Sequence, residues 1–80
     1  MVFPKVAKML AEIIEVDHQD LAPETELTDE YGIKAIDVAK LVIECEMKFK
    51  IIIHDEDVHT FRYVNDIVEY IERVRSESGL

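Results

Sequence analysis

Three stretches of this 80-residue chain place apolar residues at helical spacing, and this pattern limits the fold more than any other feature. Apolar residues at 3.6-residue intervals predict helices from about Phe3 to Val16, Ala35 to Phe49 and Val64 to Arg75. Residues 76–80 are expected to fray. The run Ile51–Ile53 favours a strand locally, but the chain offers no second convincing strand to pair with it. We therefore expect an all-α fold in which this run is a buried connector.

The connection between the first two predicted helices is long and polar. From Asp17 to Lys34 the helical periodicity fades and turn-forming residues accumulate. A connection of this length is uncommon in a compact domain and is often functional, although a simple spacer is the alternative. Leu21 and Leu27, with Tyr31, are expected to fasten it to the core. Further along, Asp55–Val58 predicts one short helical turn with acids near its positive end.

The second predicted helix has a broad apolar face and a charged side. The apolar face comprises Ile36, Ala39, Val42, Ile43, Met47 and Phe49, flanked by Leu41 and Cys45. The charged side comprises Asp37, Lys40, Glu44, Glu46 and Lys48. Because Cys45 falls on or beside the apolar face, we interpret it as a small packed hydrophobic residue rather than a nucleophile.

Acidic residues outnumber basic ones by 18 to 9, for a net charge of −9. This balance argues against nucleic-acid binding, which needs a basic stripe, and favours partners with basic docking surfaces. An acidic surface kept for solubility is the alternative. The single cysteine excludes an internal disulfide, and no apolar run approaches the ~20 residues that span a membrane. We expect one domain over residues 1–80, located in the cytoplasm.

The start of the second predicted helix combines several features of a phosphate site. A helix N-terminus presents unpaired N–H groups and the positive end of the helix dipole, which both favour an anion. Lys34 adds a positive charge, and Gly32 allows a tight turn just before it. Neither Lys34 nor Ala35 can cap the helix with its side chain, and losing such a cap typically costs ~1 kcal/mol. A serine at position 35 is expected to remove this inconsistency.

From these residues onward, the sequence resembles the acyl carrier protein family over nearly the whole chain. Gly32-Ile33-Lys34-Ala35-Ile36-Asp37 matches the family's Gly-x-Asp-Ser-Leu-Asp, after the acidic Asp29-Glu30-Tyr31-Gly32. The matching positions downstream are Leu41-Val42, Glu44, Glu46, Phe49, Ile53, Asp55-Glu56-Asp57, Val64, Ile67 and Tyr70-Ile71. The resemblance implies a small antiparallel bundle of three long helices and one short helix.

The resemblance also implies a function. Members carry a 4′-phosphopantetheine arm on the motif serine, hold an acyl group on it as a thioester, and perform no chemistry themselves, so we do not expect an enzyme. The implied partners are a phosphopantetheinyl transferase and acyl-transferring or condensing enzymes, met by a monomer without membrane insertion. The cargo stays open among fatty acids, polyketide units, amino acids and specialised lipids.

Carried onto this chain, the resemblance assigns three groups of residues. The cofactor position comprises Ala35, Lys34 and Gly32. The docking face of the second helix comprises Asp37, Lys40, Glu44, Glu46 and Lys48. The acyl-chain pocket comprises Ile36, Ile43 and Ile53.

The departures from the family pattern bear directly on carriage. Ala35 stands where the motif serine belongs, so this chain cannot be modified there. Lys34 replaces the motif aspartate, and Lys40 occupies a usually acidic position, which suggests a different partner or a specialised pathway. Ala35 is either an engineered Ser→Ala change or a natural feature of a degenerate carrier. We favour engineering, because the missing cap is the only serious local flaw in this helix.

Two other functional classes are compatible with the sequence. The first is a natural, non-carrying interaction module that keeps the bundle and the docking helix. The second is a small acidic metal-binding bundle, for which His54, Asp55, Asp57 and His59 are the candidate ligands. Spacing alone does not make such ligands converge, so a solvated acidic turn is the favoured interpretation.

Overall fold

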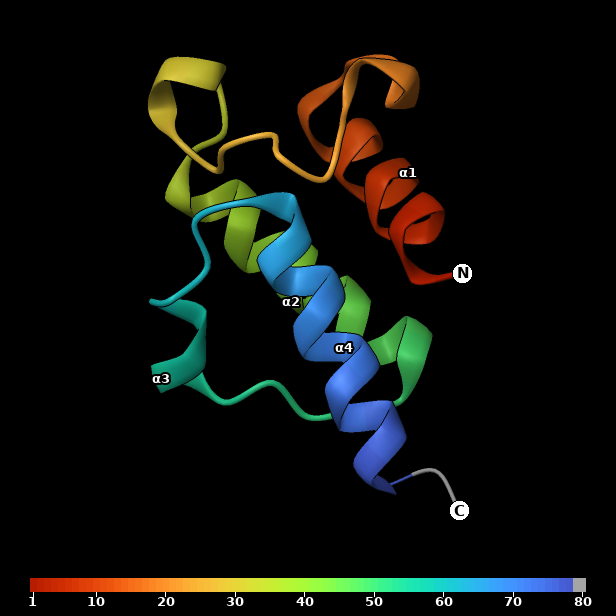
Figure 1. Ribbon diagram of the computed structural model, residues 1–80. Helices are drawn as coiled ribbons and strands as arrows, with labels where there is room; N and C mark the ends of the chain where they lie inside the picture. Colours follow the sequence, from red (N-terminus) through yellow and green to blue (C-terminus); the bar gives the residue numbers. More distant parts are fainter. Residues whose placement is uncertain (79–80) are drawn as a thin grey trace.

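Figure 1 shows the computed structural model, which describes residues 1–78, with only the backbone of Ser78. The elements are α1 (Val2–Ile14), two 3₁₀ turns η1 (His18–Asp20) and η2 (Asp29–Tyr31), α2 (Ala35–Phe49), α3 (Asp55–Val58) and α4 (Val64–Ser78). No strand forms within the described residues, where pairing is limited to one antiparallel bridge between Glu26 and Tyr63. The expectation of an all-α fold with three long helices and one short helix is confirmed.

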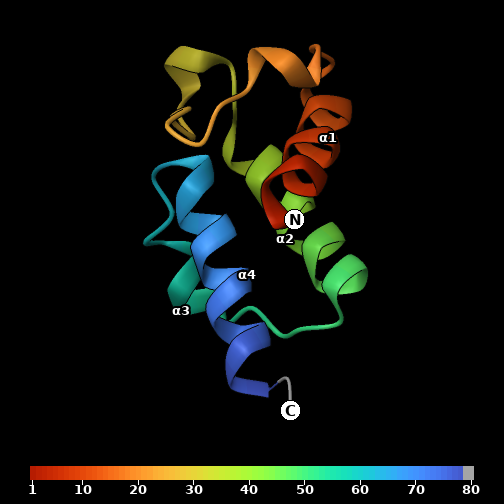
Figure 2. The ribbon, with the colours of Figure 1, turned by 45° about the vertical axis from the view of Figure 1, so that its right-hand side comes forward.

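The three long helices pack around one core. α1 contacts both α2 and α4, and it runs opposite to them, while α2 and α4 descend in the same direction (Figure 1). Figure 2 shows the short α3 beside α4, linked to the end of α2 by an extended connector. The long loop 15–34 crosses the end of the bundle where α2 begins.

The core is apolar throughout the described residues. Its fully buried large side chains are Val6, Leu10, Ile33, Leu41, Cys45, Val64, Ile67 and Ile71. No polar or charged side chain is buried among the described residues. The core therefore draws on α1, α2, α4 and the end of the long loop.

The buried face of α2 differs from the sequence-based prediction. Leu41 and Cys45, expected only to flank the apolar face, are at its centre and fully buried. Ile36, Ile43 and Met47, expected to be part of that face, are 60%, 56% and 74% exposed. The prediction was wrong because α2 carries apolar residues around most of its circumference, and periodicity alone does not tell which side meets the other helices.

Two helix boundaries differ from the prediction. α1 ends at Ile14, because Glu15 adopts the left-handed conformation with φ 60°, and its N–H bonds the Ala11 carbonyl. α4 continues past Arg75 to Ser78, so the predicted fraying is wrong for 76–78, whereas residues 79 and 80 lie outside the described residues.

The long loop is fastened as the sequence suggested, with one difference. Leu21 is buried and Leu27 packs against the core. Tyr31 is exposed, and its hydroxyl donates to the Asp20 carbonyl at 3.0 Å, so it ties the loop to itself. The connector 51–53 is buried only at Ile53.

Candidate functional site

The turn before α2 fixes where the helix reaches the surface. Gly32 has φ 94°, in the left-handed region that favours glycine, and its N–H bonds the Asp29 carbonyl. The Ile33 N–H then bonds the Thr28 carbonyl at 2.9 Å, and the Ile33 side chain is only 2% exposed. Burial of Ile33 leaves Lys34 and Ala35 exposed at the helix start. Residue 35 therefore opens a helix at the surface, as predicted.

The cap residue of α2 is Lys34, so Ala35 is the first residue inside the helix. The Asp37 carboxylate accepts a hydrogen bond from the Lys34 N–H at 2.9 Å, which is one half of a capping box. The other half is missing because a lysine side chain has donors only. The helix thus lacks a side-chain cap, as predicted, but the residue that fails to supply it is Lys34. The expectation that a serine at 35 would supply the cap is wrong, since that position lies inside the first turn.

The first turn of α2 leaves two backbone donors free. The N–H groups of Asp37 and Val38 both bond the Lys34 carbonyl, at 2.9 and 3.1 Å. The Ala35 and Ile36 N–H groups have no partner within residues 1–78. Two free donors, the helix dipole and the Lys34 charge make the surface around residue 35 favourable for a phosphate group.

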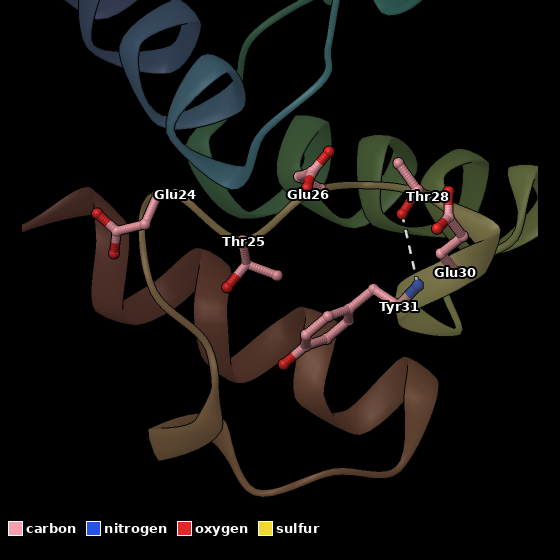
Figure 3. A pocket seen from close by; sticks show the side chains of 6 residues that line it. All are labelled: Glu24, Thr25, Glu26, Thr28, Glu30 and Tyr31. Carbon is pink, nitrogen blue, oxygen red and sulfur yellow. Dashed lines mark hydrogen bonds between the residues drawn. The ribbon is translucent and has the colours of Figure 1, made fainter.

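An acidic pocket lies beside this helix start. It has a volume of about 400 Å³ and is lined by Glu24, Thr25, Glu26, Thr28, Glu30 and Tyr31 (Figure 3). The Thr28 hydroxyl accepts the Tyr31 N–H at 3.4 Å and so caps η2. Nowhere in residues 1–78 do three or more His, Cys, Asp or Glu side chains converge as metal ligands, and this includes His54, Asp55, Asp57 and His59.

The charged residues predicted to form a docking face do not share one environment. Lys40 and Lys48 are exposed, whereas Asp37, Glu44 and Glu46 are half-buried. Glu46 accepts the Ile53 N–H at 2.9 Å and therefore holds the connector against α2. Ile36, Ile43 and Met47 form an exposed apolar line along α2.

A groove of about 420 Å³ runs between α2 and the α3 region. Of the three residues predicted to meet an acyl chain, Ile43 and Ile53 line this groove, and Ile36 does not. The structure adds Ala39, Val42, Glu46, Asp55, Val58 and His59 to its lining. Ala39 and Val42 lie one turn before Ile43 and Glu46, so helical spacing from Ile43 was the sequence signal for them.

Cys45 is fully buried in the core. Burial, reinforced by the nearby Glu44 and Glu46 charges, raises the pKa of its thiol to about 12. Because the thiolate is the nucleophilic form, this side chain is unsuited to covalent chemistry near neutral pH. The interpretation of Cys45 as a packed hydrophobic residue is confirmed.

Tyr70 fixes α3 against α4, a role that the sequence did not reveal. Its hydroxyl donates to the Asp57 carboxylate at 2.8 Å and accepts from the His54 N–H at 3.5 Å. Burial and the bond to Asp57 raise the pKa of Tyr70. Phe61 packs edge-on against the Tyr70 ring, with ring centroids 5.5 Å apart. These contacts hold one wall of the groove in place.

Comparison with known proteins identifies the class to which this helical domain belongs. The family described as "Phosphopantetheine attachment site" matches residues 4–71. A relative from Phytoplasma mali, named "Acyl carrier protein", is 36% identical over 73 residues, which cover 91% of this chain and 87% of the relative. Another with the same name, from Thermotoga maritima, is 33% identical over 72 residues, with coverages of 90% and 89%.

The chain is therefore a domain of the phosphopantetheine-binding class. Within that class it belongs to the acyl carrier protein family. Acyl carrier proteins are carriers rather than enzymes. None of the helices in residues 1–78 has the length and apolar character needed to cross a membrane.

Proposed function

We propose that this chain is an acyl-carrier-type domain with its attachment position at residue 35, and that in its alanine form it docks without covalent cargo. The supporting observation is the surface position of residue 35 beside two free backbone donors. An alanine has no hydroxyl to esterify, so the local geometry that favours a phosphodiester lacks the atom that would hold one.

In a serine form, residue 35 anchors 4′-phosphopantetheine, and Gly32 permits the turn that brings it to the surface. Lys34 and the N–H groups of residues 35 and 36 lie where they favour the phosphate. An acyl chain on the arm has an apolar destination in the groove lined by Ile43 and Ile53, with Ala39, Val42 and Val58 alongside. Because Ile36 lies outside that groove, we assign it to the docking face.

The proposed partners of a serine form are a phosphopantetheinyl transferase and acyl-transferring or condensing enzymes in the cytoplasm. Asp37, Glu44, Lys40 and Lys48 supply charges on or beside the exposed face of α2. Glu46 is left out of this face because it is bonded to the connector. The cargo class, including fatty acyl and polyketide units, is open in this proposal.

The position of the cap changes our preferred origin for Ala35. The sequence favoured an engineered Ser→Ala change because the missing cap was attributed to position 35. The cap residue is instead Lys34. An engineered change made to prevent modification at residue 35 would have no reason to alter residue 34. The missing cap therefore no longer favours engineering, and a natural non-carrying chain is the second candidate. A serine codon at position 35 of the natural gene would instead establish engineering.

The decisive experiment restores the hydroxyl. The Ala35→Ser variant is incubated with coenzyme A and a broadly active phosphopantetheinyl transferase, and intact mass is measured. We expect a gain of one phosphopantetheinyl group, because position 35 lies at the exposed helix start. Ala39→Ser is the matched control, since it places an exposed serine one turn further along the same helix.

The controls define what each outcome means. The parent chain and the Ala39→Ser variant should gain no mass. No gain by Ala35→Ser, with an acyl carrier protein of known competence modified in the same tube, would contradict the assignment of position 35. Equal gains by both serine variants would contradict the positional argument.

A further inference from the structure

The exposed face of α2 carries an apolar row that nothing in the described chain covers. Ile36, Ile43 and Met47 are 60%, 56% and 74% exposed, and their i, i+7, i+11 spacing places them on one line along the helix. α2, a helix of 15 residues, therefore carries three large apolar side chains that are exposed. Clustered exposed apolar side chains indicate an interaction surface.

We propose that this face of α2 binds the same face of a second copy of the chain, with the two α2 helices antiparallel. A two-fold axis perpendicular to the helices pairs residue i of one copy with a residue near 85 − i of the other. Ile43 then lies close to the partner's Ile43, and Ile36 lies within one turn of the partner's Met47. The apolar row is therefore complementary to itself.

The charges beside the row are self-complementary in the same register. On the helical wheel Lys40 borders the row, and Asp37, Glu44 and Lys48 follow on the same side. In an antiparallel two-fold pair this side of one helix meets the same side of the other. Asp37 then faces the partner's Lys48, and Lys40 faces the partner's Glu44. All four pairs in the dimer have opposite sign. In a parallel two-fold pair, this side of one helix meets the other side of its partner, so these four pairs do not form.

The distribution of charge over the whole chain favours the same orientation. The loop that precedes α2 carries Asp17, Asp20, Glu24, Glu26, Asp29 and Glu30, all exposed. The opposite end of α2 carries exposed Lys48 and Lys50. Antiparallel pairing brings the acidic end of one copy toward the basic end of the other.

Two features set the expected strength of association. The net charge of −9 on each copy opposes association, but at 0.15 M salt charges further apart than about 8 Å are largely screened. A contact between two helices of four turns is also smaller than the roughly 1,200 Å² buried in stable interfaces. We therefore expect a weak dimer with Kd on the order of 100 µM. The sequence alone had led us to expect a monomer.

The test is sedimentation of the unmodified chain between about 20 µM and 1 mM at 0.15 M salt. We expect a reversible monomer–dimer equilibrium. Lys40→Glu and Glu44→Lys should each weaken dimerisation at least about tenfold. Each substitution turns two opposite-charge contacts of the dimer into two like-charge contacts. An equimolar mixture of the two variants should restore dimerisation, since the mixed pair has opposite charges at both contacts.

The controls separate this interface from general charge effects. Lys8→Glu on α1 and Glu72→Lys on α4 change exposed residues by the same charges and should leave the equilibrium unchanged. Far-UV circular dichroism and urea midpoints verify that each variant is folded. A chain that stays monomeric at 1 mM overturns the proposal and leaves the apolar row to a different protein. The proposal is also overturned if Lys40→Glu and Glu44→Lys leave the monomer–dimer equilibrium unchanged, or if the equimolar mixture of the two variants fails to associate.

Discussion

The cap of α2 yields the sharpest prediction about stability. Lys34 occupies the cap position without a side-chain acceptor, and the Ile36 N–H in the first turn has no partner within the described residues. Lys34→Asp supplies a carboxylate at the position from which a cap bonds the second or third N–H of a helix. The change also replaces a positive charge by a negative one at the positive end of the helix dipole.

The size of the effect follows from these contributions. A side-chain cap adds ~1 kcal/mol, and each unit of favourable charge at a helix end adds ~0.3–1 kcal/mol. Repulsion from the Asp37 carboxylate, which stays bonded to the residue 34 N–H, removes a few tenths. Because Lys34→Asp changes the charge by two units, we expect the free energy of unfolding to rise by roughly 1–3 kcal/mol. For a domain of this size each kcal/mol raises Tm by about 4–8 °C.

Urea unfolding followed by far-UV circular dichroism measures this change as a higher midpoint at unchanged m. Lys34→Ala isolates the removal of the positive charge from the new hydrogen bond and should gain only part of the stability. Ala35→Ser changes a residue inside the first turn and should alter stability by no more than about 0.5 kcal/mol. A gain from Ala35→Ser with none from Lys34→Asp would refute our assignment of the cap position.

Two further predictions concern the interior. Tyr70→Phe removes the hydroxyl that bonds Asp57 and His54. It should lower the free energy of unfolding, measured in urea, by about 1 kcal/mol and accelerate amide exchange in α3. Unchanged exchange would show that the hydroxyl does not hold α3. Because the pKa of Cys45 rises from 9.0 unfolded to about 12 folded, stability from the buried neutral thiol is complete below pH 9 and is lost as pH rises toward 12. Urea midpoints between pH 8 and 11 should therefore fall more steeply for the parent than for Cys45→Ala, and equal slopes would contradict this linkage.

The sequence was sufficient to predict the four helices but not to predict which side of α2 is buried. The bounds of α2 and α3 were predicted correctly, α2 from Gly32 and the apolar periodicity that follows it, and α3 from the acids of Asp55–Val58. The buried side of α2 was not, since Ile36 and Ile43 satisfy a helical pattern as well as Leu41 does. Only packing against α1 decides which of them is covered.

The candidate site was likewise predicted in position and only partly in geometry. Residue 35 was correctly placed at an exposed helix start from Gly32 and the periodicity that follows it. Which residue caps the helix depends on one residue's backbone dihedral angles, which composition does not determine: Lys34 is extended, with φ −92° and ψ 164°. The bonds from Glu46 to Ile53 and from Tyr70 to Asp57 join residues 7 and 13 positions apart, beyond the reach of a local pattern.

The start of α2 separates two tasks that the family motif combines. By resemblance, residue 34 provides the cap and residue 35 provides the hydroxyl, and this chain lacks both. It keeps the residues that fix where α2 begins: Gly32 in the left-handed conformation, Ile33 in the core, and Asp37 bonded to the Lys34 N–H. The retained interactions fix where α2 begins and which face it exposes, whereas the two missing side chains are those that would cap the helix and tether an arm.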